Sequence, residues 1–251
     1  MKVRHLPLLV TLLLLLANLA AAAPQDQWIA KARAFVGAEA TLDAVHSMHI
    51  TGTLQNETGA TVPVDIICMK PDQRIIKMTF EKFTRQITLD GYDGWMQQRD
   101  SANPTNWQLT LMDREQIKHI RADNAETLYF FKGLEQRGGR IEFLGDAKID
   151  GKDTVKIAYI YGPNIVYHRY IEKTTGHQLL VEIEGGGTIR EEGEIIVDGL
   201  RFSKRIINRG ADGSPPSRVS PHAMRRRPGC ASRVTSRPHS SSARSSGLAR
   251  V

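Results

Sequence analysis

The chain has 251 residues and a formal net charge of +7 at pH 7, which is enough length for one large domain or two small ones. Residues 210–251 hold eight arginines and one acid, Asp212, so the tail accounts for the whole excess and residues 1–209 are neutral. The basic net charge therefore says nothing about the partners of residues 24–209, the body of the chain. The body holds one cysteine, Cys68, which excludes a disulfide framework. We expect Cys68 to be a small core residue.

The first 23 residues have the pattern of an export signal. Two basic residues come first, an apolar run over Leu6–Leu19 follows, and the small residues Ala20–Ala23 close the segment. The apolar run of about 14 residues is shorter than the roughly 20 that a membrane-spanning helix needs. We therefore expect cleavage near Ala22 or Ala23 and a soluble mature protein outside the cytoplasm.

The mature chain begins with a helical pattern and then changes to a strand pattern. Apolar residues three and four positions apart predict helices over about Asp26–Phe35 and about Ala38–Val45, with a break at Gly37. From His49 onward the apolar period is two, with polar turns between short runs, which predicts an antiparallel meander because parallel strands need long crossovers. The first expected strands are His49–Gln55, Val62–Met69, Arg74–Phe80, Thr84–Leu89 and Trp95–Gln98.

A helical stretch interrupts the strands around Met112 and Ile120, and the apolar cluster Leu128–Phe131 follows it. We expect one or two amphipathic helices laid against the sheet here. The later expected strands are Arg140–Ile149, Thr154–Tyr161, Ile165–Glu172, Gln178–Glu184, Thr188–Val197 and Leu200–Asn208. Asp150-Gly151 and Asp198-Gly199 predict tight hairpin turns. In total we expect about ten or eleven strands and three or four helices, a mainly β (α+β) fold.

The composition changes abruptly at Gly210. Residues 210–251 contain ten serines, five prolines and eight arginines, and no Lys, Glu, Ile, Phe, Tyr or Trp. Such a segment cannot bury enough apolar area to offset the entropy of ordering it, so we expect a disordered basic tail. The composition is also typical of out-of-frame translation of a GC-rich gene. That hypothesis would leave the sheet without a terminal strand and expose an edge.

The chain lacks the common catalytic signatures. No nucleophile elbow, phosphate-binding loop or paired-cysteine zinc motif occurs, so we expect no catalytic residues, no metal and no cofactor. The candidate site is an apolar cluster that we expect to line a ligand cavity between the sheet and the helices. Its members are Trp95, Met96, Trp107, Met112, Leu128, Phe130 and Phe131. The alternative is that this cluster simply forms the core.

The helix, turns and strands follow one another in an order shared with a known superfamily. The segments that carry the likeness are Trp28–Val45 leading into His46–Leu54, then Lys70–Arg74, Asp90–Trp95, Ile149–Val155, Tyr170–Gly176 and Val197–Leu200. With the signal before them, they resemble the outer-membrane lipoprotein-sorting protein superfamily, the periplasmic lipoprotein carriers and their divergent relatives. The resemblance covers roughly Asp26–Arg209.

The resemblance implies an incomplete, strongly curved antiparallel β-barrel whose open face is covered by helices over an apolar cavity. It also implies a non-enzymatic periplasmic carrier of lipoprotein acyl chains or another amphiphile, with membrane-associated donor and acceptor proteins as partners. We expect a monomer that binds no nucleic acid. Two other hypotheses remain open. One is a sensor or interaction module of the same fold whose own side chains fill the cavity, and the other is an enzyme whose residues are scattered along the chain.

Overall fold

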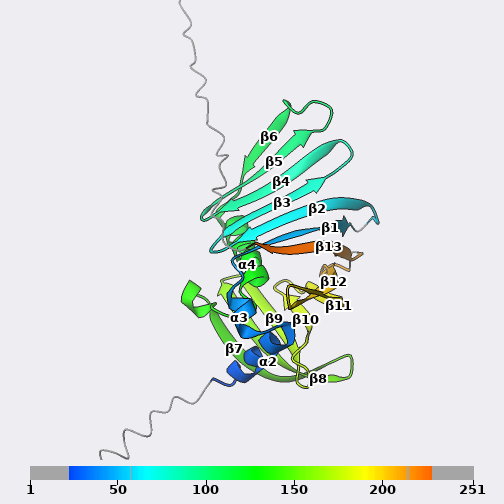
Figure 1. Ribbon diagram of the computed structural model, residues 1–251. Helices are drawn as coiled ribbons and strands as arrows, with labels where there is room; N and C mark the ends of the chain where they lie inside the picture. The colour runs from blue at the N-terminus through cyan, green and yellow to red at the C-terminus, as the bar shows by residue number, and fades with distance from the viewer. Residues whose placement is uncertain (1–22, 57, 214, 228–251) are drawn as a thin grey trace, which may run out of the picture.

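The strands of the chain form one curved antiparallel sheet (Figure 1). The computed structural model describes residues 23–56, 58–213 and 215–227. The described strands stand in the spatial order β6-β5-β4-β3-β2-β1-β13-β12-β11-β10-β9-β8-β7. Their bounds are β1 (Ser47–Gln55), β2 (Thr61–Met69), β3 (Gln73–Thr79), β4 (Phe83–Asp90), β5 (Asp93–Asp100), β6 (Trp107–Leu111), β7 (Arg140–Ile149), β8 (Lys152–Gly162), β9 (Ile165–Glu172), β10 (Gln178–Ile183), β11 (Thr188–Val197), β12 (Leu200–Arg209) and β13 (Ser217–Arg227).

The helices lie together on one side of the sheet (Figure 1). They are α2 (Asp26–Val36), α3 (Glu39–Asp43) and α4 (Arg114–Leu128), followed by a 3₁₀ turn, η1 (Glu135–Arg137). Helix α4 contacts β2, β3 and β4, whereas α2 contacts β12 on the other half of the sheet. Across the described ranges, no helix combines the length and the apolar character needed to span a membrane.

The predicted fold class is confirmed: the protein is mainly β, an open, curved antiparallel sheet covered by helices. The sheet does not close into a barrel, because its edge strands β6 and β7 are not paired with each other among the described strands. Eleven strands lie where the apolar period of two predicts them. The sequence does not predict β6 or β13. Strand β6 is a short edge strand with Trp107 45% and Leu111 74% exposed, so it lacks a clear buried face.

Strand β13 is the main departure from the sequence prediction. The tail expected to be disordered from Gly210 is ordered over Ser217–Arg227, where it lies between β1 and β12. It aligns with β1 through nine residue pairs and with β12 through three. The expectations of disorder here and of a missing terminal strand are therefore wrong. The prediction of disorder counts only the apolar side chains of the segment. Strand β13 has few of them, but its backbone groups pair with two neighbouring strands, and this pairing stabilises it.

Two of the sequence predictions fall outside the part of the chain that the structure describes. They are the signal peptide, apart from its last residue Ala23, and the tail beyond Arg227.

Strand β13 approaches β1 most closely at Gly52. A Cβ on Gly52 would lie 2.4 Å from the carbonyl oxygen of Ser220 and 3.0 Å from the Cα of Pro221. Because these are backbone atoms, they cannot rotate away as a side chain would. We expect Gly52→Ala to lower the free energy of unfolding by about 2 kcal/mol in urea denaturation. In Gly162→Ala, the matched control, the new Cβ meets nothing within 4 Å. Equal stabilities of the two variants would contradict the close approach of β13.

The two Asp-Gly turns adopt the conformation that the sequence predicts. Asp150 and Gly151 have φ angles of 50° and 79°, and Asp198 and Gly199 have φ angles of 51° and 78°. A two-residue hairpin loop with both residues at positive φ matches the twist of the strands that it joins. These turns therefore fix the hairpins β7–β8 and β11–β12.

Two groups of buried apolar residues hold the helices to the sheet. The lower cluster packs α2 and α4 against β8, β9 and β10. Its buried residues are Ala32, Ala122, Leu134, Val155, Ile157, Tyr159, Ile165, Tyr167, Ile171 and Val181. The upper cluster joins α3 and the end of α4 to β1, β2 and β12. Its buried residues are Leu42, Val45, Met48, Cys68, Leu128, Phe130 and Leu200. Cys68 is a core residue, as the sequence predicts, and burial raises the pKa of its thiol.

Helix α4 is capped at its N-terminus and ends abruptly at its C-terminus. At its start the side chain of Asp113 accepts the Gln116 N–H at 2.8 Å, and the side chain of Gln116 accepts the Asp113 N–H at 3.0 Å. At its end, Phe130 and Phe131 have φ angles of 47° and 70°. Bulky L residues rarely adopt this left-handed region, and two in succession cannot continue a right-handed helix. The apolar cluster Leu128–Phe131 therefore turns out of the helix.

Candidate functional site

A cavity of about 420 Å³ lies between the helices and the sheet. Ligand sites in proteins commonly have volumes of roughly 300–1,000 Å³ and mostly apolar walls. The large apolar side chains that line this cavity come from α2, from both halves of the sheet and from the segment after α4. They are Phe35, Val36, Met48, Ile50, Ile66, Phe130, Phe131, Val181, Ile189, Phe202, Ile206, Val219 and Met224. The cavity is therefore large enough and apolar enough to hold a small ligand.

The central strands build one wall of the cavity. Ile50 on β1 stands opposite Ile66 on β2 and opposite Met224 on β13. Side chains alternate along a strand, so these three register partners share the face that lies under the helices. Val219 of β13 adds to the same wall. The strand that the sequence does not predict is thus part of the candidate site.

A polar network lines another part of the cavity. Its centre is Arg169 on β9, which is only 4% exposed and forms an ion pair with Glu126 of α4. Arg169 also donates to the side-chain oxygen of Gln178, whose amide in turn donates to Glu191 at 3.2 Å. The Arg169 guanidinium lies 4.8 Å from the ring centroid of Phe131. The cavity therefore has charged groups as well as apolar walls.

Two tyrosines complete this network. The Tyr161 hydroxyl donates to Glu126, and the Tyr167 hydroxyl donates to Asp123 at 2.8 Å. Burial raises the pKa of both tyrosines, so both hydroxyls keep their protons and act as donors. Burial also raises the pKa of the Glu191 carboxyl, which favours its neutral form.

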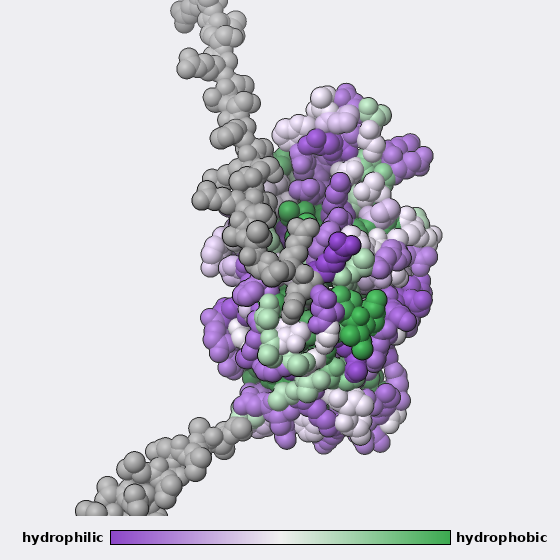
Figure 2. Space-filling view, in the orientation of Figure 1, coloured by the Kyte–Doolittle hydropathy of each residue, from purple (hydrophilic) through white to green (hydrophobic). Residues whose placement is uncertain are grey.

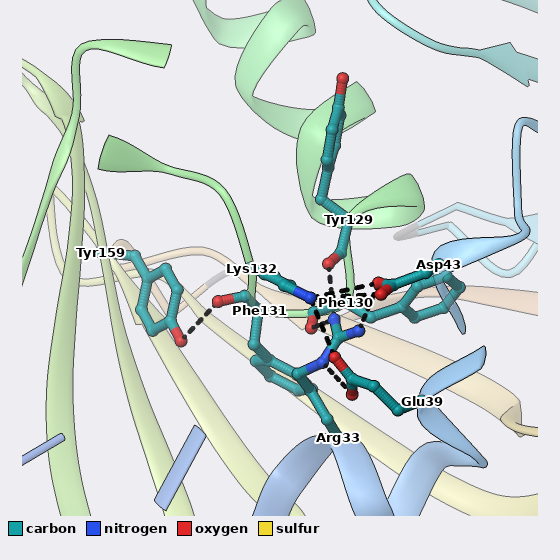
Figure 3. Close-up of polar contacts among 8 residues, drawn as sticks. All are labelled: Arg33, Glu39, Asp43, Tyr129, Phe130, Phe131, Lys132 and Tyr159. Carbon is teal, nitrogen blue, oxygen red and sulfur yellow. Dashed lines mark hydrogen bonds and ion pairs between the residues drawn. The ribbon is translucent and has the colours of Figure 1, made fainter. Parts of the chain in front are cut away.

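Arg33 of α2 fixes the segment that follows α4 (Figure 3). Its side chain is 4% exposed, and its Nη1 donates to the carbonyl oxygens of Phe130 at 2.7 Å and Tyr129 at 3.1 Å. The next carbonyl oxygen, that of Phe131, accepts from the Tyr159 hydroxyl at 3.2 Å. Three successive carbonyls are thus held, which over-determines the left-handed conformation of both phenylalanines. Their side chains are thereby positioned at the cavity.

The same arginine joins α2 to α3 (Figure 3). Arg33 Nε lies 2.8 Å from Glu39, and its Nη2 lies 2.9 Å from Asp43. Lys132 reaches the same two carboxylates at 3.0 and 3.2 Å from the solvent side. Hydrogen bonds from Arg33 and Lys132 lower the pKa of Glu39 to about 2, so this carboxylate stays charged. We call Arg33, Glu39, Asp43 and Lys132 the arginine clamp.

The structure brings only some of the sequence-predicted site residues to the cavity. Phe130 and Phe131 line it, and Leu128 is fully buried in the upper cluster behind them. The other four lie on β5, on β6 and in the short connection between β6 and α4, and none of them lines the cavity. These four are Trp95, Met96, Trp107 and Met112.

Sequence reasoning also misses Arg33. The signal for it is a single basic residue four positions after Ile29, on the apolar face of α2.

A second hollow of about 710 Å³ opens on the outer surface beside α2 and the β11–β12 turn. Figure 2 shows a hydrophobic patch where Figure 1 places β11 and β12. Ile196 of β11 is 67% exposed and lines this outer hollow. Phe35 and Arg201 line both the outer hollow and the inner cavity. The Arg201 guanidinium lies 4.3 Å from the Phe35 ring centroid, and the His177 ring stacks on Phe35 at 4.7 Å. Phe35 therefore stands between the two hollows.

Known proteins resemble this chain in structure rather than in sequence. No protein-family model matches the chain, and no curated protein matches its sequence. A DUF1329 family protein from Desulfovibrio piger matches the fold with a TM-score of 0.55 and 10% identity, over 82% of this chain and 95% of that chain. A LolA superfamily protein from Nitrosomonas europaea matches with a TM-score of 0.54 and 14% identity, over 82% of this chain and 94% of that chain.

An outer membrane lipoprotein-sorting protein domain from Vibrio parahaemolyticus also matches, with a TM-score of 0.50 and 14% identity, over 80% of this chain and 92% of that chain. The chain has the fold of the LolA superfamily. The resemblance that the sequence motifs suggest is therefore confirmed at the level of the fold. Identities of 10–14% carry the likeness no further than the fold.

Proposed function

We propose that this chain is a non-enzymatic periplasmic carrier that holds lipoprotein acyl chains or another amphiphile in the inner cavity. The observation that carries the proposal is the cavity itself, a hollow of about 420 Å³ with mostly apolar walls inside a folded domain. Fully buried residues pack on both sides of it in the lower and upper clusters, so the hollow is a local feature and not general loose packing. One matched structure is named as an outer membrane lipoprotein-sorting protein domain, and this name supports the same direction.

The physical driving force for such binding is burial of apolar area. Each methylene moved from water into an apolar site contributes about 0.8 kcal/mol. About ten methylenes therefore contribute on the order of 8 kcal/mol before the entropic costs of binding. No covalent step is needed to load or release such a ligand, and membrane-associated donor and acceptor proteins would supply and remove it.

The rival hypothesis is a sensor or interaction module whose own side chains fill the cavity. That hypothesis requires no free space beside Phe130 and Phe131. Both residues line the hollow, which favours the carrier.

The test of the carrier is a fluorescence titration with cis-parinaric acid, a fluorescent fatty acid. We expect saturable binding of one probe per chain. Ile50→Trp places a larger side chain in the cavity and should weaken binding at least tenfold, roughly 1.4 kcal/mol or more. Ile67→Trp is the matched control, because Ile67 is on the neighbouring strand and alternates to the opposite face. Absence of saturable binding, or equal loss in the two variants, would contradict the proposal.

A further inference from the structure

We propose that Arg74 of β3 binds the carboxylate of a single-chain fatty acid whose hydrocarbon tail lies in the cavity. This inference rests on the proposed function and names the ligand class more narrowly. Arg74 lines the cavity together with the apolar wall formed by Ile50 and Ile66. Its register partner on β2 is Cys68, two residues from Ile66 and on the same face of the sheet. A tail on that wall would place its headgroup beside the guanidinium.

The hydrogen bonds of Arg74 leave donors unused. Its Nη1 donates to the Thr127 hydroxyl at 3.3 Å, and its Nε is buried without an acceptor in the described structure. Glu126, the residue before Thr127 on α4, forms the ion pair with Arg169. The Nε of Arg169 is also buried without an acceptor in the described structure. A buried N–H without an acceptor is destabilising, so ligand oxygens at this place would satisfy groups that the protein leaves unsatisfied.

The charges around the cavity point to a monoanion. Arg169 is balanced by Glu126, and Arg201 is balanced by Glu194 at 3.3 Å. Among the described residues, no carboxylate lies within 4 Å of the Arg74 guanidinium nitrogens.

Two further acids line the cavity, and neither forms an ion pair with Arg74. Asp123 is exposed to solvent and accepts from Tyr167, and the burial of Glu191 favours its neutral form. Among the described arginines that line the cavity, Arg74 is therefore the one whose guanidinium has no carboxylate in ion-pair contact, which leaves it available to one ligand carboxylate. A guanidinium is suited to this role because its planar donors match the two oxygens of a carboxylate.

The test compares cis-parinaric acid with its methyl ester, which keeps the tail and the chromophore but removes the charge. We expect the wild-type chain to bind the acid about tenfold more tightly than the ester, roughly 1.4 kcal/mol. Arg74→Met should weaken binding of the acid about tenfold and change binding of the ester less than twofold. Retained ester binding also shows that the variant is folded.

The matched control is Arg85→Met. Arg85, on β4, also has a buried Nε without an acceptor in the described structure. Its guanidinium lies beside the rings of Phe80 and Phe83, and it does not line the cavity. We expect it to bind both probes as the wild type does. Equal affinities of the wild type for acid and ester, with no effect of Arg74→Met, would overturn this inference and leave the carrier intact. Failure to bind either probe would overturn both.

Discussion

A mature chain that ends at Arg209 is expected to lose cooperative unfolding and to aggregate. Removal of β13 takes away nine residue pairs with β1 and three with β12. At about 1 kcal/mol for each net hydrogen bond, the loss is on the order of 10 kcal/mol, comparable with the whole stability of a domain. The truncation also turns β1 and β12 into unpaired edges, which promote association through their backbone groups.

The measurement is thermal unfolding by circular dichroism together with size-exclusion chromatography. The matched control is a chain that ends at Arg227, which keeps β13 and removes only the residues after it. The control should unfold in one cooperative step and elute as a monomer. A chain ending at Arg209 that matches the control in both measurements would show that β13 is not part of the stable sheet.

Arg33→Met is expected to lower the free energy of unfolding by about 3 kcal/mol. The substitution keeps the length of the side chain but removes its contacts with the Phe130 and Tyr129 carbonyls and with both acids of the arginine clamp. The carbonyl oxygens then lose the donor that fixes the left-handed segment, and two carboxylates lose their buried partner. Binding of cis-parinaric acid should weaken as well, because Phe130 and Phe131 line the cavity.

Lys132→Met is the matched control for this prediction, because Lys132 contacts the same two acids but is 54% exposed. An exposed ion pair contributes less than about 1 kcal/mol, so we expect a small change in the free energy of unfolding. Urea denaturation of the two variants provides the comparison. If Arg33→Met costs no more than Lys132→Met, the arginine clamp does not hold the segment after α4.

The sequence predicts most of this fold because its strands alternate and its turns are explicit. The Asp150-Gly151 and Asp198-Gly199 turns each adopt the conformation that hairpins of two residues require. The failure at β13 has a different cause. Among the described side chains of β13, those of Val219, Pro221 and Met224 line the cavity, and the stability of the strand comes mainly from backbone pairing. Neither composition nor hydropathy patterns contain that information.

The candidate site is only partly predictable for a related reason. An apolar period shows that a strand has two different faces, but not which face meets the helices. Trp95 and Trp107 belong to apolar segments yet lie away from the cavity, whereas Ile50 and Ile66 line it. Arg33 and Arg74 are further cases, because their roles depend on groups brought near them by other parts of the chain. Only the folded chain joins these residues.

The central claim is that the inner cavity holds an amphiphile, and mass spectrometry of organic extracts from the purified full chain tests it most directly. We predict about one amphiphile per chain in the wild type and in Ile67→Trp, and a strongly reduced amount in Ile50→Trp, whose new side chain occupies the cavity. A folded wild-type chain that carries no amphiphile, and that also takes up no cis-parinaric acid, would contradict the carrier function.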